Sequence, residues 1–248
     1  MKALLAAVLL GAAACGMAQE GPHPTGSITV FAAASLTDAF KTLGLRFQGQ
    51  HEAVTVDFNF AGTPTLVTQL ENGAQADVFA SADGTNMDRL KSDGLTAGDS
   101  RVFAHNKLEI VVAPGNPRHI SSLADLAMPG VIYVAAGPSV PAGKYAGQAL
   151  AKAGVKVTPR SLETDVKSVV SKVELGEADA GIVYTTDVKA AGDKVAGVAI
   201  PDQYNVTATY PIVVVKGAPN PSLAQAFIDY VLSTAGQAVL ASYGFQPA

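Results

Sequence analysis

The sequence predicts an α/β fold made of βαβ units, arranged as one large domain or as two smaller α/β lobes. Two observations lead to this prediction. From residue 27 onward, short apolar runs alternate with amphipathic segments of roughly ten to fifteen residues, the pattern of strands and helices in a mostly parallel sheet. The chain has 248 residues, of which 48% are hydrophobic, and this is enough to form the core of either arrangement.

Strands are expected over the short apolar runs, at residues 28–32, 54–60, 78–80, 108–113, 131–135, 181–184 and 212–215. Helices are expected over the amphipathic segments between them, at residues 36–48, 64–72, 85–93, 122–127, 142–153, 165–175 and 222–232.

Two of these stretches are alike: LEIVVAPGNP (108–117) and YPIVVVKGAPNP (210–221) are both β-branched runs that end in a Gly, Pro and Asn turn. We interpret them as two strands with ordinary turn chemistry and not as an internal repeat. If the chain leaves one lobe near residue 105 and returns near residue 205, these two segments flank the crossings.

The charge of the chain is small. Seventeen Lys and Arg residues against 21 Asp and Glu residues give a net charge of −4, and no block of like charges occurs. A nucleic acid or an anionic membrane surface is therefore not expected as a partner.

Residues 1–18 have the features of a secretory signal: Lys2 at the start, an apolar run to Ala14 and small residues before a polar stretch. Cys15 is the only cysteine, which excludes an intramolecular disulfide. Its position resembles a lipobox that would lipidate Cys15 and anchor the protein, although Ala12 stands where Leu is usual. Cleavage after Ala18 is the alternative. Both alternatives place the mature protein in the periplasm or elsewhere outside the cytoplasm.

Two strand-to-helix corners predict a site for a group that carries lone pairs. In TVFAAASLTDAF (29–40) three small alanines lead to Ser35, which is expected to cap a helix. In FNFAGTPTLVTQLENG (58–73) Thr63 is expected at the cap, with Pro64 at the first helical position. Each corner exposes backbone N–H groups at the same edge of a parallel sheet.

One further motif resembles a nucleotide site but does not predict one. GPSVPAGKY (137–145) is not a phosphate-binding loop, because the glycine spacing is one residue too long and Tyr145 replaces the Ser or Thr that binds Mg²⁺. Pro141 in this stretch suits a helix start, and an ordinary strand-to-helix loop is the alternative.

No catalytic site is expected. The sequence contains neither G-x-S-x-G nor H-E-x-x-H, and its four histidines are scattered at positions 23, 51, 105 and 119. Asp77, Asp83, Glu163 and Asp165 lie at loops or helix starts, where capping is the expected role. An extracytoplasmic enzyme that acts on an anionic substrate is the alternative of a different class.

Several motifs together resemble those of one family. ITVFAAASLTDAF, FAGTPTLVTQLENGAQADVFASAD, VPAGKYAGQAL, GIVYTTDV and the terminal YGFQ (243–246) closely resemble the periplasmic molybdate-binding proteins of ABC importers, in the same order and over nearly all of residues 27–246.

The resemblance implies a two-lobed periplasmic-binding-protein fold of type II with the ligand in the interlobe cleft. Lobe 1 would comprise residues 27–104 plus 206–248, and lobe 2 residues 105–205. The protein would capture molybdate, and tungstate as well, and deliver it as a monomer to an ABC permease with a separate ATPase. It would need no cofactor, and molybdenum would be present only as the bound oxyanion. A binding protein for another oxyanion such as sulfate is the alternative.

The resemblance also implies which residues hold the oxyanion. Carried over by position, they are Ser35, Thr63, Ala142, Val166 and Tyr184. Ser35 would give a hydroxyl and an N–H, Ala142 and Val166 backbone N–H groups, and Tyr184 its phenol. Thr63 stands where some relatives have Ser, and its methyl group is expected to narrow the cavity. Lys144 and Lys167, beside the proposed donors, are interpreted as solvated charges on helix faces.

Overall fold

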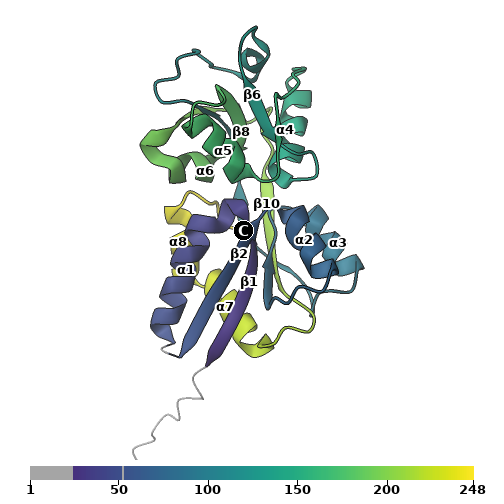
Figure 1. Cartoon of the computed structure of the whole chain (residues 1–248). Coiled ribbons are helices and arrows are strands. Elements are labelled where there is room, and N and C mark those ends of the chain that lie inside the picture. Colours follow the sequence, from purple (N-terminus) through teal and green to yellow (C-terminus); the bar gives the residue numbers. More distant parts are fainter. Residues whose placement is uncertain (1–24, 52) are drawn as a thin grey trace, which may run out of the picture.

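The computed structural model describes residues 25–51 and 53–248, which form two five-stranded sheets. Figure 1 shows one sheet with its helices above the other, with the chain passing between them close to β10. The predicted signal sequence, with Cys15, lies outside the described residues. Among the described residues, no helix combines the length and apolar character needed to cross a membrane.

Lobe 1 is the part built on the sheet with strand order β2-β1-β3-β10-β4. Its strands are β1 (Gly26–Ala33), β2 (Val54–Ala61), β3 (Val78–Ala80), β4 (Arg101–Asn106) and β10 (Ala208–Val214). Its helices are the 3-10 turn η1 (Ala34–Leu36), α1 (Thr37–Gln50), α2 (Thr63–Glu71), α3 (Gly84–Ser92), α7 (Pro221–Leu232) and α8 (Thr234–Ser242).

Lobe 2 is the part built on the sheet with strand order β7-β6-β8-β5-β9. Its strands are β5 (Leu108–Val112), β6 (Tyr133–Ala136), β7 (Leu162–Glu163), β8 (Ala180–Tyr184) and β9 (Ala196–Ala199). Its helices are η2 (Leu123–Ala127), α4 (Pro141–Lys152), α5 (Val166–Glu174), α6 (Thr185–Ala191) and η3 (Gly192–Lys194). The chain crosses between the sheets at Lys107 and again over residues 200–207.

The expectation of mostly parallel sheets is wrong, because both sheets are mixed. β1 runs parallel to β2 and β3, but β10 is antiparallel to both of its neighbours. In the same way β5 is antiparallel to β8 and β9. The reason is the two crossings: β5 and β10 start at the edge where the lobes meet and run away from it, whereas the strands of the βα units end there.

Besides the short 3-10 turns η1 and η3, five elements are not among the predicted ones: β4, β7, β9, α6 and α8. β7 is only two residues long, and β9 (AGVA) contains one β-branched residue, so their sequences carry little strand signal. The helix α6 starts at Thr185, directly after β8, so no loop residues separate it from the predicted strand.

The core of lobe 1 is aromatic. Helix α1 buries Ala39, Phe40, Leu43, Gly44 and Phe47, which lie on one face at helical spacing. The Phe47 and Phe227 ring centroids are 5.4 Å apart, and those of Phe40 and Phe227 are 6.2 Å apart. Phe227 of α7 is fully buried, so it joins α1 to α7 beneath the sheet.

We expect Phe227→Ala to lower the free energy of unfolding by about 3–5 kcal/mol, because it removes a buried ring and leaves a cavity that its aromatic neighbours cannot fill. Urea unfolding of the ligand-free protein would measure this. Leu45→Ala is the control, since Leu45 of α1 is 69% exposed and its truncation should change stability by less than about 0.5 kcal/mol. Equal losses for the two variants would contradict the assigned core.

Candidate functional site

The five residues predicted from the sequence line one cavity between the lobes. Its walls are Ala33, Ala34, Ser35, Gly62, Thr63 and Ala82 from lobe 1 and Val140, Pro141, Ala142, Asp165, Val166 and Tyr184 from lobe 2. About 10 Å³ of the cavity is open to the centre of a water molecule. In this conformation the cavity therefore suits one compact group and excludes an extended organic molecule.

The first corner presents Ser35, but not as a helix cap. Ser35 lies inside the 3-10 turn η1, and Leu36 is the residue that precedes α1, so the predicted capping role is wrong. The hydroxyl of Thr37 donates to the carbonyl of Ala34 at 2.7 Å and satisfies this end of the turn. The Ser35 hydroxyl is thereby left free of α1, and its oxygen lies 3.1 Å from the hydroxyl of Tyr210 in β10.

The second corner presents Thr63, but as the first residue of the helix and not as its cap. Gly62 is the residue that precedes α2, Thr63 is the first helical residue and Pro64 is the second. The side chain of Thr63 is buried, and its oxygen accepts a hydrogen bond of 3.4 Å from the N–H of Ala82. The Thr63 hydroxyl therefore retains its own proton for another acceptor.

The third and fourth corners supply backbone N–H groups from lobe 2. Ala142 is the second residue of α4, after Pro141, and Val166 is the first residue of α5. N–H groups in the first turn have no carbonyl partner within their own helix, so these two donors are available to the cavity. Asp165 caps α5 by accepting from the N–H of Ser168 at 2.9 Å, as predicted.

The remaining acidic candidates differ in role. Asp83 caps α3 through the N–H of Asn86, as predicted. Asp77 is no helix cap: it accepts from the N–H groups of Thr29 and Asn220, which ties β1 to the loop before α7. Across residues 25–51 and 53–248, no group of three or more His, Cys, Asp or Glu side chains is placed to hold a metal ion.

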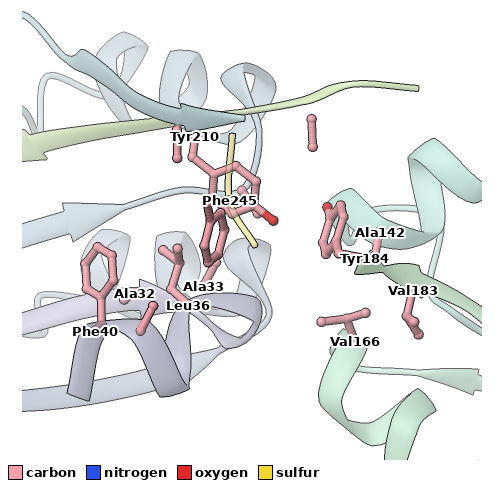
Figure 2. Close-up of a cluster of buried hydrophobic side chains, with 14 of the residues drawn as sticks. Ala32, Ala33, Leu36, Phe40, Ala142, Val166, Val183, Tyr184, Tyr210 and Phe245 are labelled. Carbon is pink, nitrogen blue, oxygen red and sulfur yellow. The ribbon is translucent and has the colours of Figure 1, made fainter. Parts of the chain in front are cut away.

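Tyr184 ends β8 and closes the cavity from lobe 2. Its hydroxyl is buried and has no hydrogen-bond partner among the described residues. Burial raises the pKa of this phenol well above its usual value, with a smaller contribution from Tyr210, so the group stays protonated and can donate. Figure 2 shows Tyr184, Ala142 and Val166 on one side of the space and Tyr210 and Ala33 on the other.

The positive charges near the cavity are already paired. Lys144 contacts the carboxylate of Asp83 at 3.4 Å, and Lys167 contacts that of Asp38 at 2.7 Å. In each pair the lysine belongs to lobe 2 and the aspartate to lobe 1. The interpretation of the two lysines as solvated charges is therefore wrong: they form ion pairs across the cleft, and neither one lines the cavity.

The two lobes are in direct contact at Gly62. A Cβ atom at this position would overlap the carbonyl oxygen of Thr164 in lobe 2. Only glycine allows this approach, so the structure represents the closed arrangement of the lobes.

Sequence reasoning missed the residues behind the cavity wall. Tyr210 and Asn106 are fully buried and connect Ser35 to the crossings between the lobes. Tyr210 lies in the apolar strand β10, and its sequence pattern is that of an ordinary core residue. Asn106 offered one signal, a polar residue between two apolar strand segments.

Comparison with known proteins identifies the family of this chain. The family model for bacterial extracellular solute-binding proteins matches residues 28–246. The molybdate-binding protein ModA of Mycobacterium tuberculosis is 42% identical to this chain, with 98% of this chain and 95% of the relative covered.

Two solved structures share the fold. The periplasmic molybdate-binding protein of Azotobacter vinelandii superposes with a TM-score of 0.78 at 21% identity, covering 89% of this chain and 99% of its own. The sulfate-binding protein SubI of Mycobacterium tuberculosis gives a TM-score of 0.79 at 21% identity, covering 90% and 87%. These superpositions confirm the predicted two-lobed α/β fold.

Asp187 predicts a pH dependence of stability. Its buried carboxylate accepts from the N–H of Tyr184 at 3.1 Å, and burial raises its pKa from 3.8 to about 6 although Lys167 lies 3.7 Å away. The folded protein therefore holds the proton more tightly than the unfolded chain. The resulting stability is fully present below about pH 4 and is lost as the pH rises through about 6.

We expect Asp187→Asn to remove this loss, by at most about 3 kcal/mol, because the amide oxygen can still accept from Tyr184. Urea unfolding at a series of pH values across this window would measure the difference from the wild type. Asp193→Asn, at an exposed turn nearby, is the control. A parallel pH profile for wild type and Asp187→Asn would rule out the assignment.

Proposed function

We propose that this chain, which belongs to the bacterial extracellular solute-binding protein family, binds molybdate between its lobes and delivers it to an ABC importer. The observation that carries the proposal is the convergence of four strand-to-helix corners and the end of β8 on one small cavity rich in hydrogen-bond donors. Membership of a binding-protein family agrees with the prediction that the chain is a transport component and not an enzyme.

The donors fit a tetrahedral dianion. Ser35 and Thr63 each offer a hydroxyl and an N–H, Ala142 and Val166 each offer an N–H, and Tyr184 offers its phenol. Hydrogen bonds to a charged group each contribute about 1.5–3 kcal/mol. The first turns of α2, α4 and α5 add the positive ends of three helix dipoles, which favour an anion without a cationic side chain.

The same donors favour an anion that carries no proton. Molybdate, tungstate and sulfate have none near neutral pH, whereas phosphate retains at least one. The phosphate O–H would meet a donor and find no acceptor, which costs about 1–3 kcal/mol. Asp165 lines the cavity, but both of its oxygens already accept hydrogen bonds from Ser168.

Sulfate is the alternative ligand. The fold does not separate the two anions, because molybdate- and sulfate-binding structures superpose equally well. Sequence supports molybdate, since the 42% identical relative over nearly the full chain is a molybdate-binding protein. The shorter S–O bonds would also leave some donors too far from an oxygen. Tungstate has the same charge as molybdate and a similar size, so we propose it as a second ligand.

The delivery of molybdate to an importer is proposed from membership of the solute-binding protein family. The protein would act outside the cytoplasm as a monomer, and present the closed, loaded form to a permease driven by a separate ATPase. It would need no cofactor. Lipidation of Cys15 and cleavage after Ala18 are the two alternatives for its N-terminus, and the mass of the mature protein would distinguish them.

We expect Ser35→Ala to weaken molybdate binding about 10- to 100-fold, because one hydrogen bond to the anion is lost. Thr63→Ala and Tyr184→Phe should act similarly. Isothermal titration would measure this, with Ser92→Ala as control, since the exposed Ser92 hydroxyl bonds to the carbonyl of Asp88 in α3. Unchanged affinity in all three site variants would refute the site, and absence of molybdate binding by the wild type would refute the function.

We expect Gly62→Ala to hold the lobes apart, because the added methyl group meets the carbonyl of Thr164. Molybdate should then compact the wild type, as measured by small-angle X-ray scattering, but not the variant. Gly147→Ala in α4 is the matched control, since nothing lies within 4 Å of the added carbon. Equal compaction of Gly62→Ala and wild type would contradict closure at this contact.

A further inference from the structure

Three hydroxyls line the cavity, and two of them, those of Ser35 and Thr63, each have a hydrogen-bond partner behind them, on the side away from the cavity. For Thr63 this partner is the N–H of Ala82, at 3.4 Å. A backbone N–H can only donate, so the Thr63 oxygen accepts from it. The proton of the Thr63 hydroxyl is therefore directed to another acceptor, and the cavity is the open side.

For Ser35 the partner is the hydroxyl of Tyr210, and either oxygen of that pair could be the donor on distance alone. The next residue decides the direction. The side-chain amide of Asn106 has its NH₂ group 3.4 Å from the Tyr210 oxygen and 2.8 Å from the Thr186 hydroxyl.

The orientation of the Asn106 amide is fixed by its backbone surroundings. The N–H of Lys107 donates to the Asn106 side-chain oxygen at 2.9 Å, and the Thr185 hydroxyl donates to the same oxygen at 3.0 Å. Because a backbone N–H requires an acceptor, the oxygen must lie on that side and the NH₂ group on the Tyr210 side.

The orientation of Asn106 sets the direction of the next two hydrogen bonds. Asn106 donates to Tyr210, so the Tyr210 proton points to Ser35, and the Ser35 proton is left for the cavity. Asn106 and Tyr210 are both fully buried, and water does not offer the chain an alternative partner. Neither residue lines the cavity.

We propose that Tyr210 and Asn106 are positioning residues that set the Ser35 hydroxyl as a donor, and so make the site selective for oxyanions without a proton. This inference rests on the proposed function. It assigns part of the anion selectivity to residues that do not touch the anion.

The test compares selenate with arsenate as competitors of bound molybdate near neutral pH. The two anions are similar in size, but selenate carries no proton and arsenate retains at least one. Their ratio of inhibition constants therefore measures discrimination against the proton and cancels effects of size and of general damage to the site.

In the wild type we expect arsenate to compete at least about tenfold more weakly than selenate. Tyr210→Phe removes the donor behind Ser35 and lets this hydroxyl turn a lone pair to the cavity, so the ratio should fall at least about threefold. Tyr243→Phe is the matched control, because it removes another tyrosine hydroxyl of lobe 1, bonded at 2.7 Å to Thr42, and should leave the ratio unchanged.

Asn106→Asp serves if Tyr210→Phe fails to fold, as judged by thermal melting against Tyr243→Phe. A carboxylate at this position accepts from Tyr210, which reverses the chain, so molybdate should bind more weakly and the ratio should fall again. A ratio within about twofold of wild type in the folded variant overturns the proposal. So does a wild type in which arsenate competes as well as selenate. Failure of the wild type to bind molybdate refutes the proposed function instead.

Discussion

Among the residues that the structure describes, none with a cationic side chain lines the cavity, and this is the constraint on which the rest of the structure depends. In the part of the chain that the structure describes, the wall consists of hydroxyls, helix N-termini and small apolar groups, and its one charged side chain, Asp165, caps a helix. The partial positive charges of first-turn N–H groups must then stabilise an anion in place of a lysine. A single helix start presents few of them, and in the proposed site the donors therefore come from both lobes and form one set only when the lobes are closed.

The same constraint explains how the lobes meet. Small residues, such as Ala33 and Gly62, let the backbones approach until Gly62 touches Thr164. The cations lie outside, where Lys144 and Lys167 join the lobes through Asp83 and Asp38. Both partners of the Lys167–Asp38 pair are partly exposed, and an ion pair of this kind contributes only about 0–1 kcal/mol, whereas Asp83 of the Lys144 pair is buried. Both pairs join lobe 1 to lobe 2 and therefore favour the closed arrangement of the lobes.

The sequence predicts the local features of the site but not the contacts between segments that are far apart in the chain. The strand-to-helix corners pointed to Ser35 and Thr63, and the resemblance carried by the motifs implied the two-lobed fold and the five residues that the structure brings together. The sequence does not distinguish a hydroxyl residue at a helix cap from one at the neighbouring position. The predicted positions of Ser35 and Thr63 relative to their helices were therefore wrong. The antiparallel β5 and β10, the ion pairs across the cleft and the contact of Ser35 with Tyr210, 175 positions away, depend on the crossings between lobes, which leave no local pattern.

The crossings also explain why the polar chain behind Ser35 lies where it does. Asn106 is the last residue of β4, directly before one connection, and Tyr210 lies in β10, just after the other. Under the proposed hinge motion these are the parts of the chain that move least. The hydrogen bond from Asn106 to Thr186 of lobe 2 can therefore persist while the cavity opens. A donor direction set from the hinge is present before the anion arrives, so the anion meets an oriented Ser35 hydroxyl and the cost of ordering it falls on folding instead of on binding.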